Sequence, residues 1–385
     1  MRLHEYQAKQ RFARYQIPTP AGHVVTSPQD AYAVAAALAQ PVVLKAQVLT
    51  GRGGRGSGVK AAFNAAEAQN HAAEMLGMKI KGVIVRKLLI EPVIKSVASI
   101  YLGITCDRNV SRLAIMASNA PIADIEASAH LQPSTIIREY IHPFSGLHNY
   151  QVRNLANGLN LPREHWDDFT RIAQRLYRCG IESDATLAEI DPLALTPDGR
   201  LLALSSRLVI DDNALARQPE LRAMHDSDAE LRALAQARAA EISYIKLSGQ
   251  IGCIVNGAGL AMTTMDMITT YGDGTVGPAN FLDIGGGAQA DKVTAGLHII
   301  LADPDVKVIL LNIFGGTTRG DEVARGILQA LDEIRGEGPL VIRLMGTHAE
   351  EGRTLLESAC PNDLHVVTTL NEATQLAIAI ALGTL

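Results

Sequence analysis

Three glycine-rich turns occur in the last third of the chain, and each follows a run of apolar residues. They are Asn256-Gly-Ala-Gly259, Gly285-Gly-Gly-Ala288 and Asn312-Ile-Phe-Gly-Gly-Thr-Thr318. Glycines leave backbone N–H groups open to an anion, and a helix that begins at such a turn adds about half a positive charge. One such cluster alone is as compatible with a tight turn as with a ligand site. Three clusters on successive turns favour a site for a phosphate-like anion, at the first and third turns above all.

A lysine and a glycine-rich loop form a second candidate site, near the amino terminus. Lys45 stands near the end of the apolar run 42–46, and the loop from Thr50 to Lys60 carries five glycines within eight positions. Such a loop exposes backbone amides, and a lysine beside it can pair with phosphate. Taken alone, Lys45 is more often a solvated lysine at a strand end. The loop therefore carries the hypothesis of a nucleotide site.

Two carboxylates two positions apart suggest a metal site. Glu189 and Asp191 belong to one predicted strand, and side chains at such a spacing face the same side. Together they could hold a magnesium ion that bridges nucleotide phosphates. The alternative is a strand-end acid followed by a turn-forming Asp-Pro, which is nearly as common.

The elements that must position the first-domain residues are predicted from apolar periodicity and turn residues. The first 20 residues predict a helix that stops at Pro18, and Ser27 predicts an N-cap for a helix over 30–39. The strands at 83–85, 100–105 and 113–116 are expected in one antiparallel or mixed sheet. Further helices are expected at 149–158 and 162–179, followed by strands at 187–190 and 201–204. This last hairpin brings Glu189, Asp191 and Ser205 close together.

The second half of the chain alternates strands and helices. Residues 217–243 are charged and alanine-rich and predict a helical connection, so we place the domain boundary near 240. Beyond it, strands are expected at 251–255, 281–284, 306–311, 340–344 and 366–367, with helices between them. This order predicts a parallel sheet covered on both faces, as in the flavodoxin-like arrangement. Ligands of such sheets bind outside the carboxyl ends of the strands, where the glycine turns lie.

Composition excludes several classes of protein. Of 385 residues, 47% are hydrophobic and 19% are charged, which predicts a globular chain of more than one domain. The formal net charge of -5 gives no electrostatic drive toward nucleic acid or an anionic membrane. There is no apolar leader or long apolar run, so we expect a soluble protein of a cytoplasmic or matrix-type compartment. The four cysteines are far apart and are expected to be reduced core thiols.

Four motifs resemble one known family over essentially the whole chain: the β subunits of succinyl-CoA synthetase. They are Leu3-His-Glu-Tyr-Gln-Ala-Lys9, Asn256-Gly-Ala-Gly-Leu-Ala-Met262, Asn280-Phe-Leu-Asp-Ile-Gly-Gly-Gly-Ala288 and Asn312-Ile-Phe-Gly-Gly316. The resemblance implies a fold of the α/β and α+β classes. It assigns an ATP-grasp nucleotide-binding domain to residues 1–240 and a flavodoxin-like CoA-ligase domain to residues 241–385.

The resemblance also implies a reaction and a partner. A dicarboxylic acid such as succinate or malate, CoA and ATP or GTP would give acyl-CoA through an acyl phosphate. An α subunit would bring CoA and a phosphorylated histidine, so no catalytic residue is assigned to this chain. Whether the complex is one αβ pair or a dimer of pairs is left open.

Site residues follow from the matching positions. The nucleotide is assigned to Lys45, Gly53, Gly54, Arg55, Glu91 and Ser99. The magnesium ion is assigned to Asp191 and Ser205, and the carboxylate of the acid to Asn256, Gly316, Thr317 and Thr318.

Several of these positions depart from the family pattern. The glycine loop has its phosphate-facing arginine displaced or absent, and Ser99 stands where a glutamate is usual. The metal pair is normally asparagine and aspartate, so Asp191 and Ser205 move the carboxylate from the second position to the first. A following Asp-Gly-Lys has become Ser205-Ser206-Arg207, and a hydrophobic pair has become Thr317-Thr318.

Two hypotheses remain. The first is a working ligase whose magnesium is held by Asp191 and whose threonines accept a different or more polar acid. The second is a degenerate subunit that binds an α partner and anions without nucleotide turnover, because a hydroxyl holds magnesium less well than a carboxylate. We favour the ligase.

Overall fold

The protein consists of two compact units, Met1–Glu230 and Leu231–Leu385. A computed structural model describes residues 1–49, 58–119, 136–226, 232–334, 338–359 and 363–384. The predicted boundary near residue 240 lies just after α8 (Arg232–Ala239), a helix that belongs to the second unit.

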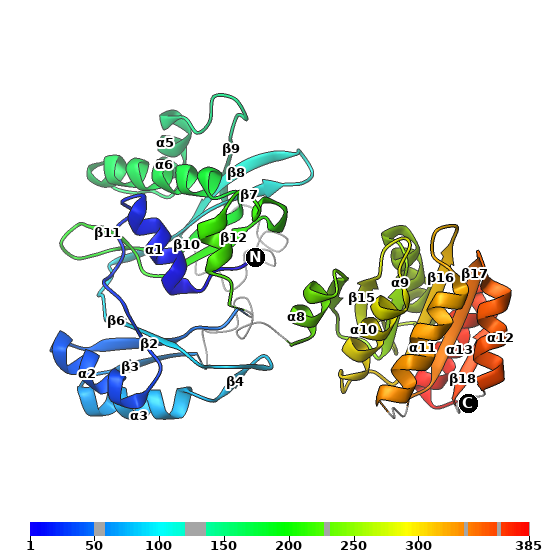
Figure 1. Ribbon diagram of the computed structural model, residues 1–385. Helices are drawn as coiled ribbons and strands as arrows, with labels where there is room; N and C mark the ends of the chain where they lie inside the picture. Colours follow the sequence, from blue (N-terminus) through cyan, green and yellow to red (C-terminus); the bar gives the residue numbers. More distant parts are fainter. Residues whose placement is uncertain (50–57, 120–135, 227–231, 335–337, 360–362, 385) are drawn as a thin grey trace. The chain divides into compact units, whose positions relative to one another are not determined.

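The first unit contains a four-stranded antiparallel sheet in the order β1-β6-β2-β3 (Figure 1). Its strands are β1 (His23–Val25), β2 (Val42–Ala46), β3 (Val59–Ala62) and β6 (Leu88–Pro92). Helices α2 (Pro28–Leu38) and α3 (Ala65–Met75) pack against it through alanines and Met75. As predicted, Ser27 caps α2, since its side chain accepts a hydrogen bond from the Asp30 N–H.

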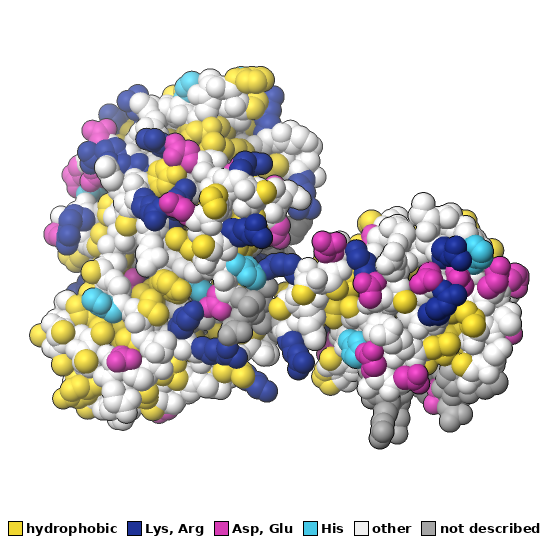
Figure 2. Space-filling model, in the orientation of Figure 1, with side chains coloured by type: hydrophobic (Ala, Val, Ile, Leu, Met, Phe, Trp, Pro, Cys, Tyr) yellow, Lys and Arg dark blue, Asp and Glu magenta, His cyan; other side chains and the backbone are white. Residues whose placement is uncertain are grey.

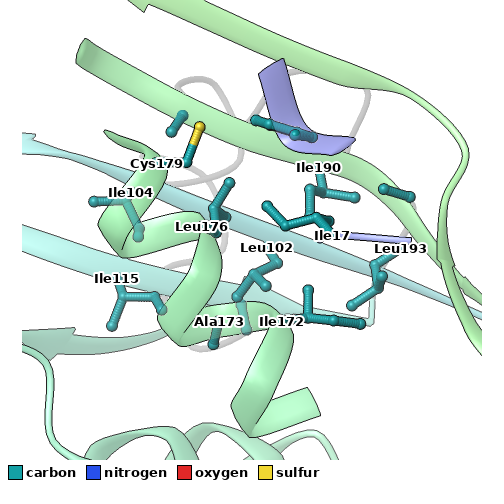
Figure 3. Packing of buried hydrophobic residues seen from close by; sticks show 14 of the residues in the cluster. Ile17, Leu102, Ile104, Ile115, Ile172, Ala173, Leu176, Cys179, Ile190 and Leu193 are labelled. Carbon is teal, nitrogen blue, oxygen red and sulfur yellow. The ribbon is translucent and has the colours of Figure 1, made fainter. Parts of the chain in front are cut away.

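A larger antiparallel sheet in the first unit has the order β11-β10-β7-β8-β9, with β12 also paired to β10. Its strands are β7 (Ala98–Asp107), β8 (Arg112–Ser118), β9 (Ile137–Tyr140), β10 (Ala185–Leu195), β11 (Leu201–Ala203) and β12 (Ser206–Ile210). Helices α1 (Glu5–Arg14), α5 (Asn149–Gly158) and α6 (Trp166–Glu182) share one core with this sheet. Figure 3 shows α6 packing Ile172, Ala173 and Leu176 toward Leu102 of β7 and Ile190 of β10.

The two-residue period of these strands separates the core from the opposite face of the sheet. Ile100, Leu102 and Ile104 of β7 lie in the core shared with α6. Tyr101, between them, belongs to a different small cluster with Ala114 and Met116. The side of the sheet away from α6 is therefore free to carry functional side chains.

The prediction for this sheet included one strand that belongs elsewhere and missed two others. The strand at 83–85 was predicted in the same sheet as 100–105, but β5 (Val83–Ile84) pairs only with β4 (Lys79–Ile80) among the described strands. Strands β9 and β12 of the larger sheet were not predicted, although β12 follows β11 after only two residues. The wrong placement of 83–85 concerns pairing between strands, which a short apolar run does not specify.

The second unit is a six-stranded sheet in the order β13-β15-β14-β16-β17-β18. Its strands are β13 (Ser243–Lys246), β14 (Ile251–Val255), β15 (Asn280–Asp283), β16 (Val308–Gly315), β17 (Leu340–Gly346) and β18 (Leu364–Val367). All neighbours are parallel except β13, an antiparallel edge strand that the sequence analysis missed. The parallel strands follow the flavodoxin order, as predicted.

Helices cover both faces of this sheet (Figure 1). One core contains α9 (Ala258–Gly272) and α13 (Leu370–Leu382). The other contains α8, α10 (Ala290–Leu301), α11 (Gly320–Ile334) and α12 (Ala349–Ala359). Alternate residues of β16 enter the two cores, Val308 and Leu310 on one side and Ile309 and Leu311 on the other. This explains why its sequence is a continuous apolar run; helix α13 was not predicted.

Three described cysteines are free thiols, but one prediction about them was wrong. Cys179 and Cys253 are buried, and burial raises the pKa of each to about 12, so they stay protonated. Cys106 is exposed rather than in the core. Cys360 lies outside the described residues.

Surface charges are mixed. On the face that Figure 2 shows, basic and acidic side chains lie among one another on each unit. Within the described ranges, no helix combines the length and apolar character needed to cross a bilayer.

Candidate functional site

A cleft of the first unit contains several of the predicted nucleotide and metal residues. It consists of two adjoining cavities of about 200 Å³ and about 670 Å³. Both are lined by Glu5, Lys45, Val59, Asp191 and Ser205. Strand β2 contributes Lys45 and β10 contributes Asp191, so the cleft joins the two sheets. The larger cavity is within the usual size range of small-molecule sites.

Lys45 lies at the centre of this cleft, but its ammonium group is already hydrogen bonded within the chain. Its Nζ is 2.7 Å from Glu5 Oε1, 2.8 Å from Glu91 Oε2 and 2.6 Å from the Leu204 carbonyl oxygen. Each N–H donor of the ammonium therefore has an acceptor. Although burial opposes the charged form, Glu5 and Glu91 raise the pKa of Lys45.

Lys9 of α1 binds the same three partners. Its Nζ is 2.5 Å from Glu91 Oε1, 2.7 Å from the Leu204 oxygen and 3.1 Å from Glu5 Oε1. Burial lowers the pKa of Lys9, against the raising effect of Glu5. We call Glu5, Lys9, Lys45 and Glu91 the ionic quartet. It contains two positive and two negative groups, so its formal charge is balanced.

Glu91 is the most buried member of the quartet, with 1% of its surface exposed. The family resemblance assigns Glu91 to the nucleotide. In the structure each of its oxygens accepts a hydrogen bond from one lysine, and it lines the larger cavity. Its assignment to the nucleotide stays a prediction beside this structural role.

A phosphate that binds Lys45 must replace one of the present acceptors. The Glu5 side chain is 18% exposed, against 2% for Glu91, so Glu5 can leave most easily. Glu5→Gln is therefore expected to tighten Mg·ATP binding by roughly tenfold, since one carboxylate no longer competes for Lys45. Calorimetry with Mg·ATP measures the change. In a Lys45→Met background the same substitution should give no gain; unchanged or weaker binding of Glu5→Gln in the native background would contradict the prediction.

The other predicted nucleotide residues are only partly described. Ser99 lines the larger cavity, together with Tyr101 and Asn119. Gly53, Gly54 and Arg55 lie outside the described residues. The segments on either side of that loop reach the smaller cavity through Leu49 and Gly58.

The predicted metal residues are brought together as expected. Asp191 and Ser205 line both cavities, and the Asp191 N–H donates to the Ser205 carbonyl oxygen at 3.2 Å. Within the described ranges, no group of three or more His, Cys, Asp or Glu side chains is arranged to hold a metal ion. Magnesium at nucleotide sites is usually bound by one or two carboxylates, with phosphates and water as its other ligands. Asp191 fits that role.

Glu189, the second carboxylate considered for magnesium, also faces the cleft. Its core neighbours on β10, Ala188 and Ile190, point the other way, into the α6 core. Both of its oxygens have partners: Arg207 Nε lies 3.3 Å from Oε1, and the Tyr101 hydroxyl donates to Oε2 at 3.2 Å.

The glycine turns of the second unit lie at the carboxyl ends of its parallel strands, as predicted. Their backbone amides are partly occupied by the chain's own side chains. Asp283 Oδ1 accepts from the Gly257 N–H at 2.6 Å and from the Gly285 N–H at 2.8 Å. Thr318 Oγ1 accepts from the Gly287 N–H at 3.1 Å. Asp283 was not predicted as a site residue, although it lies only two residues before Gly285, where the second turn begins.

Asn256 is also engaged within the chain. Its Nδ2 donates to the Phe314 oxygen at 2.9 Å and to Thr318 Oγ1 at 3.1 Å, while its Oδ1 accepts from the Phe314 N–H at 2.9 Å. The amide thus ties the first turn to the third. A substrate carboxylate at Asn256 would have to displace one of these bonds or use the backbone of Gly316 and Thr317, which are exposed.

Thr318 provides a direct test of this arrangement. Its side chain is 1% exposed and its hydroxyl accepts from two turns. Thr318→Val keeps the shape and removes the acceptor, so we expect a loss of about 1–3 kcal/mol in the free energy of unfolding. Urea unfolding measures it. The neighbouring Thr317→Val, at an exposed position, is the control and should change stability by less than about 0.5 kcal/mol; equal effects would contradict the assignment.

Comparisons with known proteins agree with this division of the chain. The family model for the ATP-grasp domain matches residues 2–195, and that for CoA-ligase matches residues 254–380. The chain is 48% identical over 386 residues to the succinate–CoA ligase [ADP-forming] subunit beta of Chloroflexus aggregans, covering 100% of both chains. It is 44% identical over 391 residues to the subunit of the same name from Anaeromyxobacter dehalogenans, covering 99% of both.

A solved structure shares the fold over nearly the whole chain. ATP citrate lyase from Methanothrix soehngenii, in complex with citrate and coenzyme A, matches with a TM-score of 0.67 at 18% identity. The match covers 98% of this chain and 99% of the other. At this identity the likeness concerns the fold alone.

Proposed function

The chain belongs to the family of succinate–CoA ligase β subunits, and from this premise we propose the reaction that it carries out with a partner subunit. It joins a dicarboxylate to CoA at the expense of ATP, giving acyl-CoA, ADP and phosphate. The partner is an α subunit that carries CoA and the histidine to be phosphorylated. The cytoplasm is the expected location.

The reaction balances in three transfers. The terminal phosphoryl group of ATP moves to a nitrogen of the partner's histidine, so that a P–O bond breaks and a P–N bond forms. A carboxylate oxygen of the acid then takes the phosphoryl group, so that the P–N bond breaks, a P–O bond forms and an acyl phosphate results. The CoA thiol loses its proton and its sulfur attacks the acyl carbon, so that a C–S bond forms, the C–O bond to phosphate breaks and phosphate leaves.

The cleft of the first unit carries this proposal. One observation matters most: Lys45 and Asp191 line the same cavity of about 670 Å³ beside the ends of the glycine loop. A lysine can neutralise phosphate charge, and a carboxylate can hold a magnesium ion that phosphates complete. Magnesium bound at Asp191 would offset charge on the transferred phosphate. We assign ATP rather than GTP because the relatives' names specify ADP as the product.

The second unit is proposed to hold the acid. Its glycine turns present Asn256, Gly316, Thr317 and Thr318 at one edge of the sheet, next to amides that already bind the Asp283 carboxylate. Hydrogen bonds from N–H groups to a charged acceptor contribute roughly 1.5–3 kcal/mol each. The exposed Thr317 hydroxyl would accommodate a more polar acid than succinate, so malate is the second candidate.

Co-expression with the α subunit tests the proposal. The purified complex, supplied with ATP, CoA and magnesium, should form acyl-CoA and ADP in equal amounts with succinate or malate. Labelled phosphate from the terminal position of ATP should appear transiently on the α subunit. No product with any of these acids, from an intact complex, would reject the proposed function.

A further inference from the structure

Arg207 stands in the nucleotide cleft without an assigned role. It belongs to β12, directly opposite Glu189 of β10 in the antiparallel pairing. It lines the smaller cavity together with Lys45, Asp191 and Ser205. Its position therefore brings a permanent positive charge to the cavity that Lys45 and Asp191 also line.

A chain of contacts across three strands fixes the guanidinium. Arg207 Nε pairs with Glu189 Oε1 at 3.3 Å, and Glu189 Oε2 accepts from the Tyr101 hydroxyl at 3.2 Å. Glu189 and Tyr101 are both buried. Gly103, opposite Glu189 on β7, leaves room for the tyrosine, since a Cβ there would lie 2.1 Å from its oxygen. The carboxylate that orients Arg207 is thus held in place itself.

The rest of the guanidinium is available to a ligand. Within the described ranges, the ion pair through Nε is the only polar contact of this group, which leaves the N–H groups of Nη1 and Nη2. The Arg207 side chain is 26% exposed, so a ligand in the cavity can reach it. A planar fork of N–H donors matches two oxygens of a phosphate.

The formal charge of the cleft indicates why a phosphate needs the Arg207 guanidinium there. The ionic quartet is formally neutral, because its two lysines are balanced by Glu5 and Glu91. Arg2, which also lines the smaller cavity, adds one positive charge, and Asp191 and Glu189 add two negative charges. A nucleoside polyphosphate entering the cleft would otherwise meet little net positive charge from the described side chains.

We propose that Arg207 binds the outer phosphates of the nucleotide through Nη1 and Nη2, with Glu189 and Tyr101 positioning it. This inference rests on the proposed function and adds a binding residue to it. The ligand class is a nucleoside di- or triphosphate, because Arg207 lines the same cavity as Asp191, the residue assigned to a magnesium ion that bridges phosphates.

Calorimetry on the full chain tests the inference, with Mg·ATP, Mg·ADP and AMP as probes. Arg207→Ala should weaken Mg·ATP binding by roughly 10- to 100-fold, the range for charged hydrogen bonds, and change AMP binding by less than about twofold. Arg200→Ala is the matched control, since Arg200 is exposed and pairs with Asp198 outside the cleft. It should bind all three probes like the native chain.

A double variant distinguishes the loss of a direct contact from a change in the charge of the cleft. It also avoids the folding defect that an unpaired buried Glu189 would cause. Glu189→Gln with Arg207→Gln removes both members of the pair, so the formal charge of the cleft is unchanged and no lone buried carboxylate remains. Direct contact predicts that Mg·ATP binding still falls at least about tenfold.

The outcomes are distinct. Native-like Mg·ATP binding by Arg207→Ala, or by the double variant, would overturn the role of Arg207 and leave the proposed function standing. An equal loss for ATP and AMP would show a merely structural role and would also overturn it. No ATP binding by the native chain would overturn both proposals.

Discussion

Asp191→Asn is expected to lower ATP-dependent acyl-CoA formation by more than the roughly 10- to 100-fold that changes around a metal's ligands cost, because it removes a ligand itself. Asp191 lines both cavities of the cleft and carries the only carboxylate of the predicted metal pair. Ser205→Ala should cost only a few-fold, since a hydroxyl is a weak ligand for magnesium. Rates of the complex measured across a magnesium titration separate the two effects.

Ser205→Asp is the complementary change. A second carboxylate beside Asp191 should lower the magnesium concentration needed for half-maximal activity. Equal losses for Asp191→Asn and Ser205→Ala would contradict the assignment of the metal to Asp191. A native-like rate for Asp191→Asn at limiting magnesium would do so as well.

The largest effect on stability is expected at Glu91. Glu91→Gln leaves Lys9 and Lys45 with Glu5 as the only carboxylate of the quartet, in a site where both lysine side chains are largely buried. Removing one partner of a buried ionic group costs about 3–5 kcal/mol, because the remaining charges lose compensation. The free energy of unfolding from urea titration of the full chain measures this loss.

An exposed ion pair supplies the control for Glu91. Glu74 of α3 pairs with Lys60, and its side chain is 60% exposed. Glu74→Gln should change stability by less than about 1 kcal/mol. If Glu91→Gln is equally mild, the quartet is not an important source of stability in the first unit.

Most of the second unit could be predicted from local sequence. Each buried parallel strand is a short apolar run, as at 251–255 and 340–344, and these runs alternate with helices, which predicts a parallel sheet with helices on both faces. The edge strand β13 was not predicted, because its alternate residues are exposed and it lacks a continuous apolar run. Helix α13 was not predicted either, although Thr369 caps its start and Gly383 follows its end, and both residues are recognisable signals of helix termini.

The first unit was predicted less completely, because its site depends on contacts between residues that are far apart in the sequence. The hairpin that joins Asp191 and Ser205 is local, so their proximity could be predicted from sequence. The partners of Lys45 could not, because Glu5 and Leu204 lie 40 and 159 residues away along the chain. The Tyr101 contact of Glu189 likewise spans 88 residues. Long-range polar contacts of this kind leave no periodic signal.

The roles of the individual site residues are predictions. The structure groups Lys45, Glu91, Ser99, Asp191 and Ser205 around one cleft. It also adds Glu5 and Arg207 as residues that compete for, or contribute to, phosphate binding. In the second unit it adds Asp283, whose carboxylate already occupies two of the amides that the sequence analysis reserved for a ligand.

Calorimetry of Mg·ATP binding to the full chain is the most direct test of the central claim, that the cleft around Lys45 and Asp191 is a working nucleotide site with a single metal carboxylate. The account predicts saturable binding of one nucleotide per chain that weakens strongly when magnesium is removed. A folded sample that gives no binding heat, with or without magnesium, would contradict it and would favour a degenerate subunit.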